Sequence, residues 1–197
     1  MEHNDSMRRT GRAARALVVA LGCLPLPSCF DFPVPLDPEP KLKLDSRLLG
    51  AWACLPAEPT VPPDLRVKAG EDDRPIALKF EGANLKYRVR IVGLDKPDEE
   101  GVWEGFASEL GERTVLNLRA VSAEAKPDEF TLVTYRLLSP SVVQFDLIDD
   151  DPVKGKPLSP SSELRKTLLA HRPQDELFKA FMVCVRAKIE DPSPLLE

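Results

Sequence analysis

The sequence predicts a mostly β domain, an antiparallel meander of about eight short strands that closes into a small barrel. One or two short helices are expected before the last strand. Three observations support this fold class. Short runs alternate apolar and polar residues, as half-buried strands do. The connections between these runs are short, which favours antiparallel neighbours. Finally, two cysteines lie in the first and last predicted strands, at Cys54 and Cys184.

The clearest hairpin signal lies in residues 76–91. Apolar side chains occupy alternate positions on both sides of a turn predicted at residues 81–84. Basic residues between the apolar positions of the second run are expected to form a solvated outer face. The apolar positions are Ile76, Leu78, Phe80, Leu85, Tyr87, Val89 and Ile91, and the basic ones are Lys86, Arg88 and Arg90.

The remaining elements follow from shorter patterns. A helical turn is predicted at residues 44–49, with Asp45 or Ser46 as its cap. The other predicted strands are residues 50–55, 102–107, 114–119, 130–135, 142–148 and 183–189.

Two short helices are expected between the last two of these strands. The first has Ser159 as its cap and Pro160 as its first residue, and it ends at His171. The second covers residues 174–181, with Leu177, Phe178 and Phe181 facing inward.

The N-terminal residues resemble the signal peptide of a bacterial lipoprotein. Four arginines precede a short apolar run, residues 16–22, which is too short to span a bilayer. Residues 26–29 then resemble a lipobox, so residues 1–28 are predicted to be removed and Cys29 to carry the lipid. Cys23 is the alternative acceptor, and an ordinary cleaved signal with an incidental cysteine is the alternative interpretation.

The predicted mature chain has three parts. Residues 29–43 are rich in proline and are expected to form an extended tether of roughly 30–40 Å. Residues 44–190 form the domain, and residues 191–197 a disordered tail. Removal of four arginines and two acids with residues 1–28 changes the formal charge from −5 to −7. This acidic balance argues against nucleic acid as a partner.

The cysteines of the predicted domain are expected to pair, since export places them in an oxidising compartment. A bond between Cys54 and Cys184 requires the first and last strands to be neighbours, as closure of a barrel does. Two separate buried thiols are the alternative.

The start of the first strand resembles the Gly-x-Trp motif of the lipocalins and related calycin barrels. Gly50 and Trp52 match the motif, and Arg186 matches the arginine that packs over the tryptophan in that family. The resemblance implies a calycin-like barrel with a cation–π contact between Arg186 and Trp52. The Thr-Asp-Tyr turn of the family is absent from this chain, and fold alone does not fix function.

Few residues suggest a catalytic or metal-binding role. His171 is the one histidine after residue 28, and its place at a predicted helix end favours a capping role. Residues 149–151 are three consecutive aspartates that fit a solvated turn better than a calcium loop. Trp103 and Phe106 either line a cavity or pack in the core. No catalytic residue, metal ligand or cofactor site is therefore assigned.

These observations favour a non-enzymatic protein held by its lipid in the cell envelope, on the periplasmic side of a membrane or at the cell surface. The membrane is one partner, and the barrel is expected to bind a small apolar ligand. The alternative is a filled barrel that acts as an interaction or assembly module for other envelope proteins. Bulky inward residues would favour the filled barrel.

Overall fold

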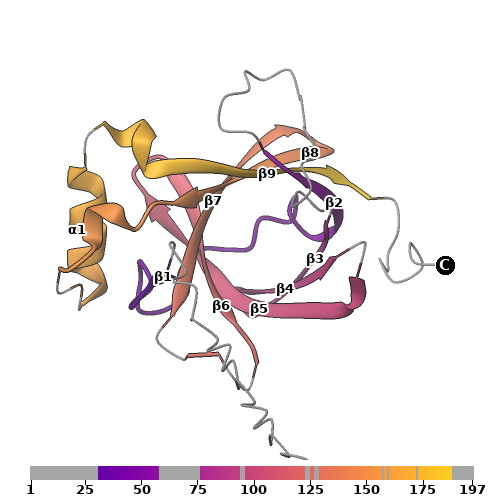
Figure 1. The fold of residues 1–197 in the computed structure, drawn as a ribbon, viewed down its shortest axis with the longest axis horizontal. Helices are drawn as coiled ribbons and strands as arrows, with labels where there is room; N and C mark the ends of the chain where they lie inside the picture. The colour runs from indigo at the N-terminus through magenta and orange to yellow at the C-terminus, as the bar shows by residue number, and fades with distance from the viewer. Residues whose placement is uncertain are drawn as a thin grey trace, which may run out of the picture.

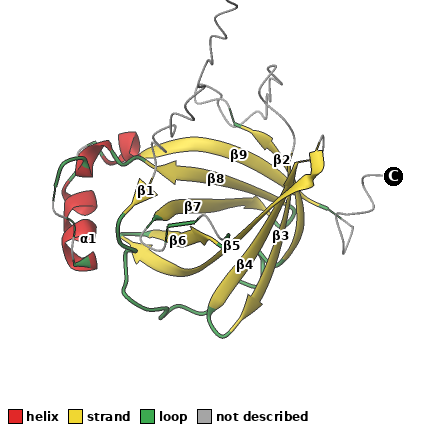
Figure 2. Ribbon diagram, turned by 60° about the horizontal axis from the view of Figure 1, so that its bottom comes forward, coloured by secondary structure: helices red, strands yellow, loops and turns green. Residues whose placement is uncertain are grey.

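The computed structural model describes residues 31–57, 76–93, 96–122, 125–126, 129–156, 158, 160–171 and 173–187. Eight antiparallel strands form a closed barrel, which confirms the predicted fold class (Figures 1 and 2). The barrel strands are β2 (Gly50–Pro56), β3 (Ile76–Ala83), β4 (Lys86–Gly93), β5 (Lys96–Leu110), β6 (Arg113–Ala120), β7 (Phe130–Ser139), β8 (Val142–Ile148) and β9 (Phe178–Arg186).

The barrel closes because its first and last strands pair. Strands β2 to β8 form a meander, and β9 pairs with both β8 and β2. Each barrel strand thus has two partners, which removes the exposed edges that promote aggregation. A ninth strand, β1 (Asp31–Phe32), pairs with the first residues of β7.

The β3–β4 hairpin shows the predicted alternation but a different turn. Tyr87 and Val89 are buried, whereas Lys86 and Arg88 are exposed, as the pattern predicts. The turn, however, consists of Asn84 and Leu85, whose φ angles are 51° and 64°. Positive φ at both central residues gives the twist that a two-residue hairpin needs. Leu85 is therefore exposed in the turn rather than buried in the strand.

A helical segment connects β8 to β9 and lies beside the barrel (Figure 2). It comprises the 3₁₀ turn η1 (Asp151–Val153), the helix α1 (Ser161–Ala170) and the 3₁₀ turn η2 (Gln174–Leu177). Pro160 is the N-cap of α1 rather than its first residue, and His171 is the C-cap. None of the described helices has the length and apolar character of a membrane span.

The second predicted helix is wrong after Leu177. From Phe178 onward the chain is β9, which pairs with β8 through an irregular register beside Phe145. Leu177 is fully buried and Phe178 is half-buried, but Phe181 is 41% exposed. Cross-strand pairing thus overrides the helical spacing of these apolar residues.

The residues that precede the barrel contact its outer wall. Phe32 and Leu36 are buried, and the backbone N–H of Leu36 donates to Asn117 Oδ1 at 2.7 Å. Arg165 of α1 donates to Asp37 Oδ2 at 2.8 Å. The assignment of all residues 29–43 to an extended tether is therefore wrong for residues 31–37. Burial of apolar side chains and two polar contacts hold this part to the barrel.

The described residues form two apolar cores. The interior cluster fills the barrel, and the outer cluster lies between the barrel wall, α1 and the N-terminal residues. The interior cluster includes Leu48, Trp52, Cys54, Leu78, Phe80, Tyr87, Val89, Leu116, Val133, Phe145 and Cys184. The outer cluster includes Phe32, Leu36, Leu110, Val115, Leu132, Ile148, Leu164, Leu168 and Leu177.

Several predictions lie outside the described residues. They concern the signal peptide at residues 1–28, lipid acceptors Cys23 and Cys29, and the tail at residues 191–197.

Candidate functional site

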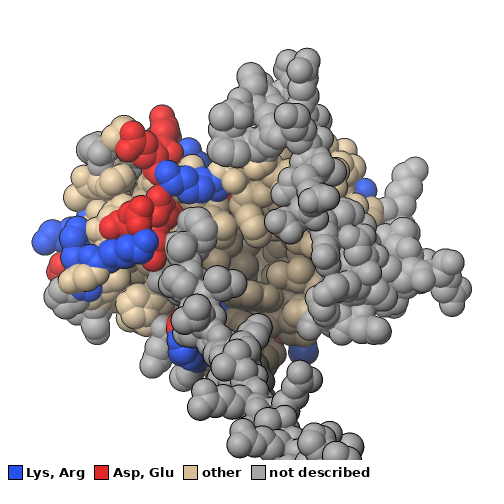
Figure 3. Space-filling model, in the orientation of Figure 1, with Lys and Arg blue, Asp and Glu red and all other residues tan. Residues whose placement is uncertain are grey.

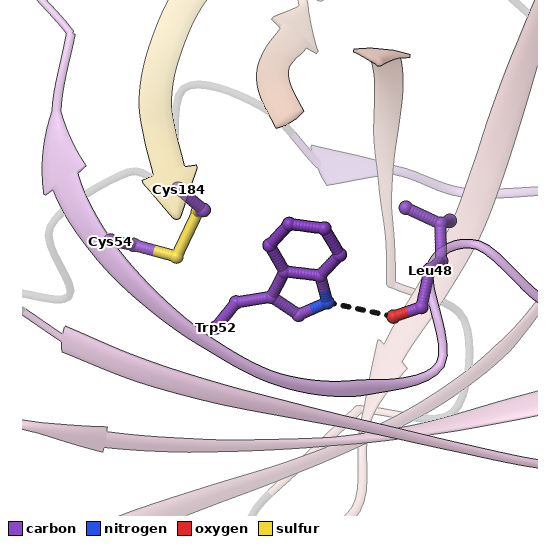
Figure 4. The surroundings of a disulfide bond; sticks show 4 residues. All are labelled: Leu48, Trp52, Cys54 and Cys184. Atoms are coloured by element: carbon purple, nitrogen blue, oxygen red, sulfur yellow. Dashed lines mark hydrogen bonds between the residues drawn. A yellow bond between two sulfur atoms is a disulfide. The ribbon is translucent and has the colours of Figure 1, made fainter. Parts of the chain in front are cut away.

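The predicted cysteine pair is a disulfide in the structure. Cys54 on β2 and Cys184 on β9 are direct cross-strand partners, and both belong to the interior cluster (Figure 4). The bond joins residues 130 positions apart in the sequence. It therefore fixes covalently the same strand pair whose hydrogen bonds close the barrel.

Trp52 and Arg186 lie together at one end of the barrel. Trp52 is fully buried, and its Nε1 donates to the carbonyl oxygen of Leu48 at 2.8 Å (Figure 4). The Arg186 guanidinium lies 4.4 Å from the centroid of the Trp52 ring. Arg186 also donates to the carbonyl oxygens of Leu49, at 2.8 Å, and of Arg47. These bonds hold the turn at residues 45–48 across this end, which we call the closed end.

Gly50 is required by this arrangement. Its φ of 112° lies in a region that side chains rarely adopt, and an added Cβ would stand 3.1 Å from Arg186 Nη1. Gly50, Trp52 and Arg186 are thus brought together by β2 and β9.

Polar groups complete the closed end around Asp45. The Tyr135 hydroxyl donates to Asp45 Oδ2 at 3.0 Å, and the Asp45 backbone N–H donates to the Tyr87 hydroxyl oxygen at 2.6 Å. The hydrogen bond from Arg47 lowers the pKa of Asp45, and burial raises the pKa of both tyrosines. Both tyrosines therefore remain neutral at physiological pH and act as hydrogen-bonding groups of the closed end.

A layer of aromatic side chains lies in the barrel interior next to the closed end. The rings of Phe80 on β3 and Phe145 on β8 are stacked, with centroids 5.8 Å apart. These two strands are not neighbours in the sheet, so the contact crosses the interior. Tyr87 and Tyr135 extend the layer at 6.2 Å from Phe80 and 6.4 Å from Phe145. At this level aromatic side chains from opposite parts of the wall thus meet across the interior.

The opposite end of the barrel has partly exposed apolar residues that pack against the interior cluster. We call this group the apolar mouth, and it consists of Ile76, Ile91, Trp103 and Leu147. Ile76, Ile91 and Leu147 lie near the ends of their strands that are remote from the closed end. Trp103 lies in the middle of the longer strand β5, but it pairs with Ala120, the last residue of β6. In Figure 3 the described charged residues gather over the α1 side, while the centre of the barrel is recessed and uncharged.

The aromatic residues of β5 have different positions. Trp103 is part of the apolar mouth and lies opposite Val89 on β4 and Ala120 on β6. Phe106 is buried but does not belong to the interior cluster. Of the two residues that the sequence offered as cavity lining, Trp103 alone has the position for it.

An open groove of about 480 Å³ lies where β6 and β7 separate near the closed end. The β6–β7 pairing includes Val115 and Thr134 but not the residues nearer this end. The groove is lined by Arg47, Glu112, Arg113, Thr114, Tyr135, Arg136 and Leu137. Asp146, which is buried, lies 3.8 Å from Arg113 and 3.7 Å from Arg136. The basic residues thus have acidic partners, and the groove has no clear preference for anions.

The outer wall carries a strip of apolar residues over β2 and β9. Leu55 and Val183 are direct cross-strand partners, and Val185 and Phe181 continue the strip along β9. Val185 is 52% exposed, although the outer face of a barrel wall is ordinarily polar. The strip was not predicted from the sequence, because apolar residues on both faces of β9 hide the alternation that would assign some of them to the outer face.

The three aspartates at residues 149–151 lie closer together than a fully solvated turn requires. Their carboxylate oxygens are within 4.8 Å of one another. Lysines neutralise them: Lys179 Nζ lies 3.5 Å from Asp149, and Lys154 Nζ lies 2.5 Å from Asp151. Asp151 is exposed, but Asp150 is buried. Lys154 Nζ lies 3.4 Å from Asp150 Oδ1 without forming a hydrogen bond to it.

Asp150→Asn is expected to raise the melting temperature at pH 7. Burial raises the pKa of Asp150, so the carboxyl group of Asp150 binds its proton more tightly in the folded protein than in the unfolded chain. The stability contributed by the protonated group is complete below the unfolded pKa and is lost as the pH rises through the folded pKa. The gain from Asp150→Asn should thus be largest at neutral pH and disappear in acid, as thermal unfolding between pH 3 and 7 will show.

Asp151→Asn is the matched control for this measurement. A hydrogen bond from Lys154 lowers the pKa of Asp151, so the charged form is favoured in the folded protein. Asp151→Asn should therefore not stabilise at pH 7. An equal rise in both variants would contradict the assignment to Asp150.

The chain matches no protein-family model, no curated protein and no solved structure. The likeness of the Gly50–Trp52–Arg186 arrangement to lipocalins consequently remains a prediction. The barrel, its disulfide and the positions of the residues above are the structural basis for a proposal about function.

Proposed function

We propose that this protein is a non-enzymatic, lipid-anchored protein of the cell envelope whose calycin-like barrel binds a small apolar ligand at the apolar mouth. One observation carries the proposal. Ile76, Ile91, Trp103 and Leu147 point into the barrel yet remain partly exposed at one end. Apolar surface that is concave and open to solvent gains free energy when an apolar molecule covers it.

The aromatic layer limits the ligand. Because Phe80 and Phe145 stack across the interior, they lie between a ligand at the mouth and the closed end. A short acyl chain or a compact apolar molecule fits this depth better than a long extended lipid. The four mouth residues carry no titratable group, and for this reason we assign the site a binding role without catalysis.

Displacement of a fluorescent fatty acid tests the proposal. The native protein should bind the probe and release it to a short-chain fatty acid. Ile91→Glu places a charge in the mouth and should weaken probe binding at least tenfold, because burial of an unpaired charge is costly.

Leu85→Glu is the control, since Leu85 lies in the exposed turn of the same hairpin. This variant should bind as the native protein does. No saturable probe binding by the native protein, or equal weakening in both variants, would refute the ligand-binding function.

A second candidate function rests on the outer apolar strip of Leu55, Phe181, Val183 and Val185. Three of these residues are exposed large apolar side chains, which favours contact with another envelope protein. A pull-down from envelope extract would support this module if Val185→Glu lost a partner that Leu138→Glu retained. Leu138 is similarly exposed but lies on β7, which β8 separates from β9.

A further inference from the structure

We propose that the mouth end of the barrel lies directly against the headgroups of a phospholipid bilayer. The inference rests on the proposed lipid at Cys29. It names the surface that meets the membrane and the direction in which the apolar mouth faces.

The first step is the attachment of β1 to the barrel. Asp31 pairs with Thr131, and Phe32 pairs with Phe130, at the start of β7. Phe32 is almost completely buried in the outer cluster. Further along, Asn117 binds Leu36 through one side-chain oxygen, while its Nδ2 donates to Phe106 O at 3.1 Å and Ser108 Oγ at 2.9 Å. The attachment is thus supported by buried apolar contacts and a buried, fully bonded amide.

The second step is the length of chain that remains. One residue, Phe30, separates Cys29 from Asp31. An extended chain spans at most about 3.5 Å per residue, so two residues reach no farther than roughly 7 Å from the start of β1. This is much shorter than the 30–40 Å tether expected from the sequence. A lipid at Cys29 would therefore hold the barrel at the bilayer surface.

The end of the barrel that faces the bilayer follows from the place where β1 pairs with β7. In an antiparallel barrel, the start of β7 lies at the same end as the starts of β3 and β9 and the ends of β4, β6 and β8. This is the end that carries Ile76, Ile91 and Leu147. Val121, just after β6, adds a side chain that is 44% exposed. Asp31, the first residue of β1, thus lies nearer to the apolar mouth than to the closed end. With the mouth at the bilayer, an apolar ligand can pass between bilayer and barrel with little exposure to water.

The experiment uses the full, natively lipidated protein in phosphatidylcholine vesicles that contain a nickel-chelating lipid. A nitroxide is attached to Val121→Cys at the mouth end or to Leu138→Cys near the β7–β8 turn at the closed end. These positions match in exposure, at 44% and 47%. Since the other cysteines are acylated or paired, the introduced thiol is the one that reacts. Nickel should relax the label at residue 121 strongly and the label at residue 138 weakly.

A lengthened anchor provides the second variant. Twelve Gly and Ser residues inserted after Phe30 leave β1 and its contacts unchanged but allow the barrel to leave the surface. In this variant the label at residue 121 should lose most of its relaxation by nickel. Equal relaxation of the two labels without the insertion, or no effect of the insertion, would overturn the inference.

Flotation of the vesicles separates this inference from the proposed function. If the native protein floats but the labels do not differ, the anchor stands and the orientation is wrong. If the native protein does not float, the anchor itself fails. If Cys29→Ala still floats and Cys23→Ala does not, the lipid is on Cys23, and seven intervening residues remove the argument for close approach.

Discussion

The Cys54→Ala/Cys184→Ala variant is expected to melt about 10 °C or more below the native protein. The disulfide closes a loop of 130 residues, for which the entropic model gives a stabilisation of about 5 kcal/mol. For a chain of this size, each kcal/mol corresponds to about 2–4 °C in the melting temperature. Thermal unfolding followed by circular dichroism measures the difference.

Chemical reduction of the native protein is the control for this result. The alanine variant loses both the bond and two buried sulfur atoms, whereas reduction removes the bond alone. Reduction should lower the melting temperature of the native protein and leave that of the variant unchanged. An unchanged melting temperature of the native protein in reductant, with loss of the bond verified by mass, would contradict the stabilising role.

Gly105→Ala is expected to destabilise the barrel by about 3 kcal/mol or more, at the upper end of the range for overpacking. A Cβ at this position would overlap the carbonyl oxygen of Asn117 and stand 2.8 Å from its carbonyl carbon. The obstacle is backbone on the neighbouring strand β6, which cannot rotate aside as a side chain can. Relief therefore requires β5 and β6 to separate, and urea unfolding will measure the cost.

Gly101→Ala is the matched control for Gly105→Ala. Both glycines lie on β5, four residues apart, and lose the same backbone freedom on substitution. The nearest atom to a Cβ at Gly101 is Trp103 Nε1, at an ordinary 3.5 Å. Gly101→Ala should change the free energy of unfolding by less than about 1 kcal/mol. Equal effects of the two variants would show that close strand approach is not the cause.

Much of the barrel could be predicted because alternation is a local property of a half-buried strand. Tyr87 and Val89 are buried and Lys86 and Arg88 exposed, as their spacing requires. The pairing of Cys54 with Cys184 was also accessible, since it needs only a closed meander and an oxidising compartment.

Other features depend on contacts between distant residues. Phe178 and Phe181 have helical spacing after Leu177, but β8 was available as a partner, and the segment became strand β9. Residues 31–37 have the proline-rich composition of a tether, yet Asn117, 81 residues beyond Leu36, holds them to the wall. No local pattern reports such a partner.

The candidate site was predicted only in outline. The sequence identified bulky inward residues but not which of them meet across the barrel. Phe80 and Phe145 lie 65 positions apart, and their stacking closes one level of the interior. Trp103 and Ile91 have the same alternation but remain at the open end. The depth at which the barrel is filled is thus set by tertiary packing, which alternation does not encode.

The pairing of β2 with β9 has a consequence for the order of events during synthesis. A chain that emerges from its N-terminus presents β2 long before β9, and the meander has a free edge at each side until residue 186 arrives. Incomplete forms are therefore open sheets, which associate readily with one another. The pairing of β9 with β2 removes both free edges at the final step, and the bond between Cys54 and Cys184 then keeps them closed.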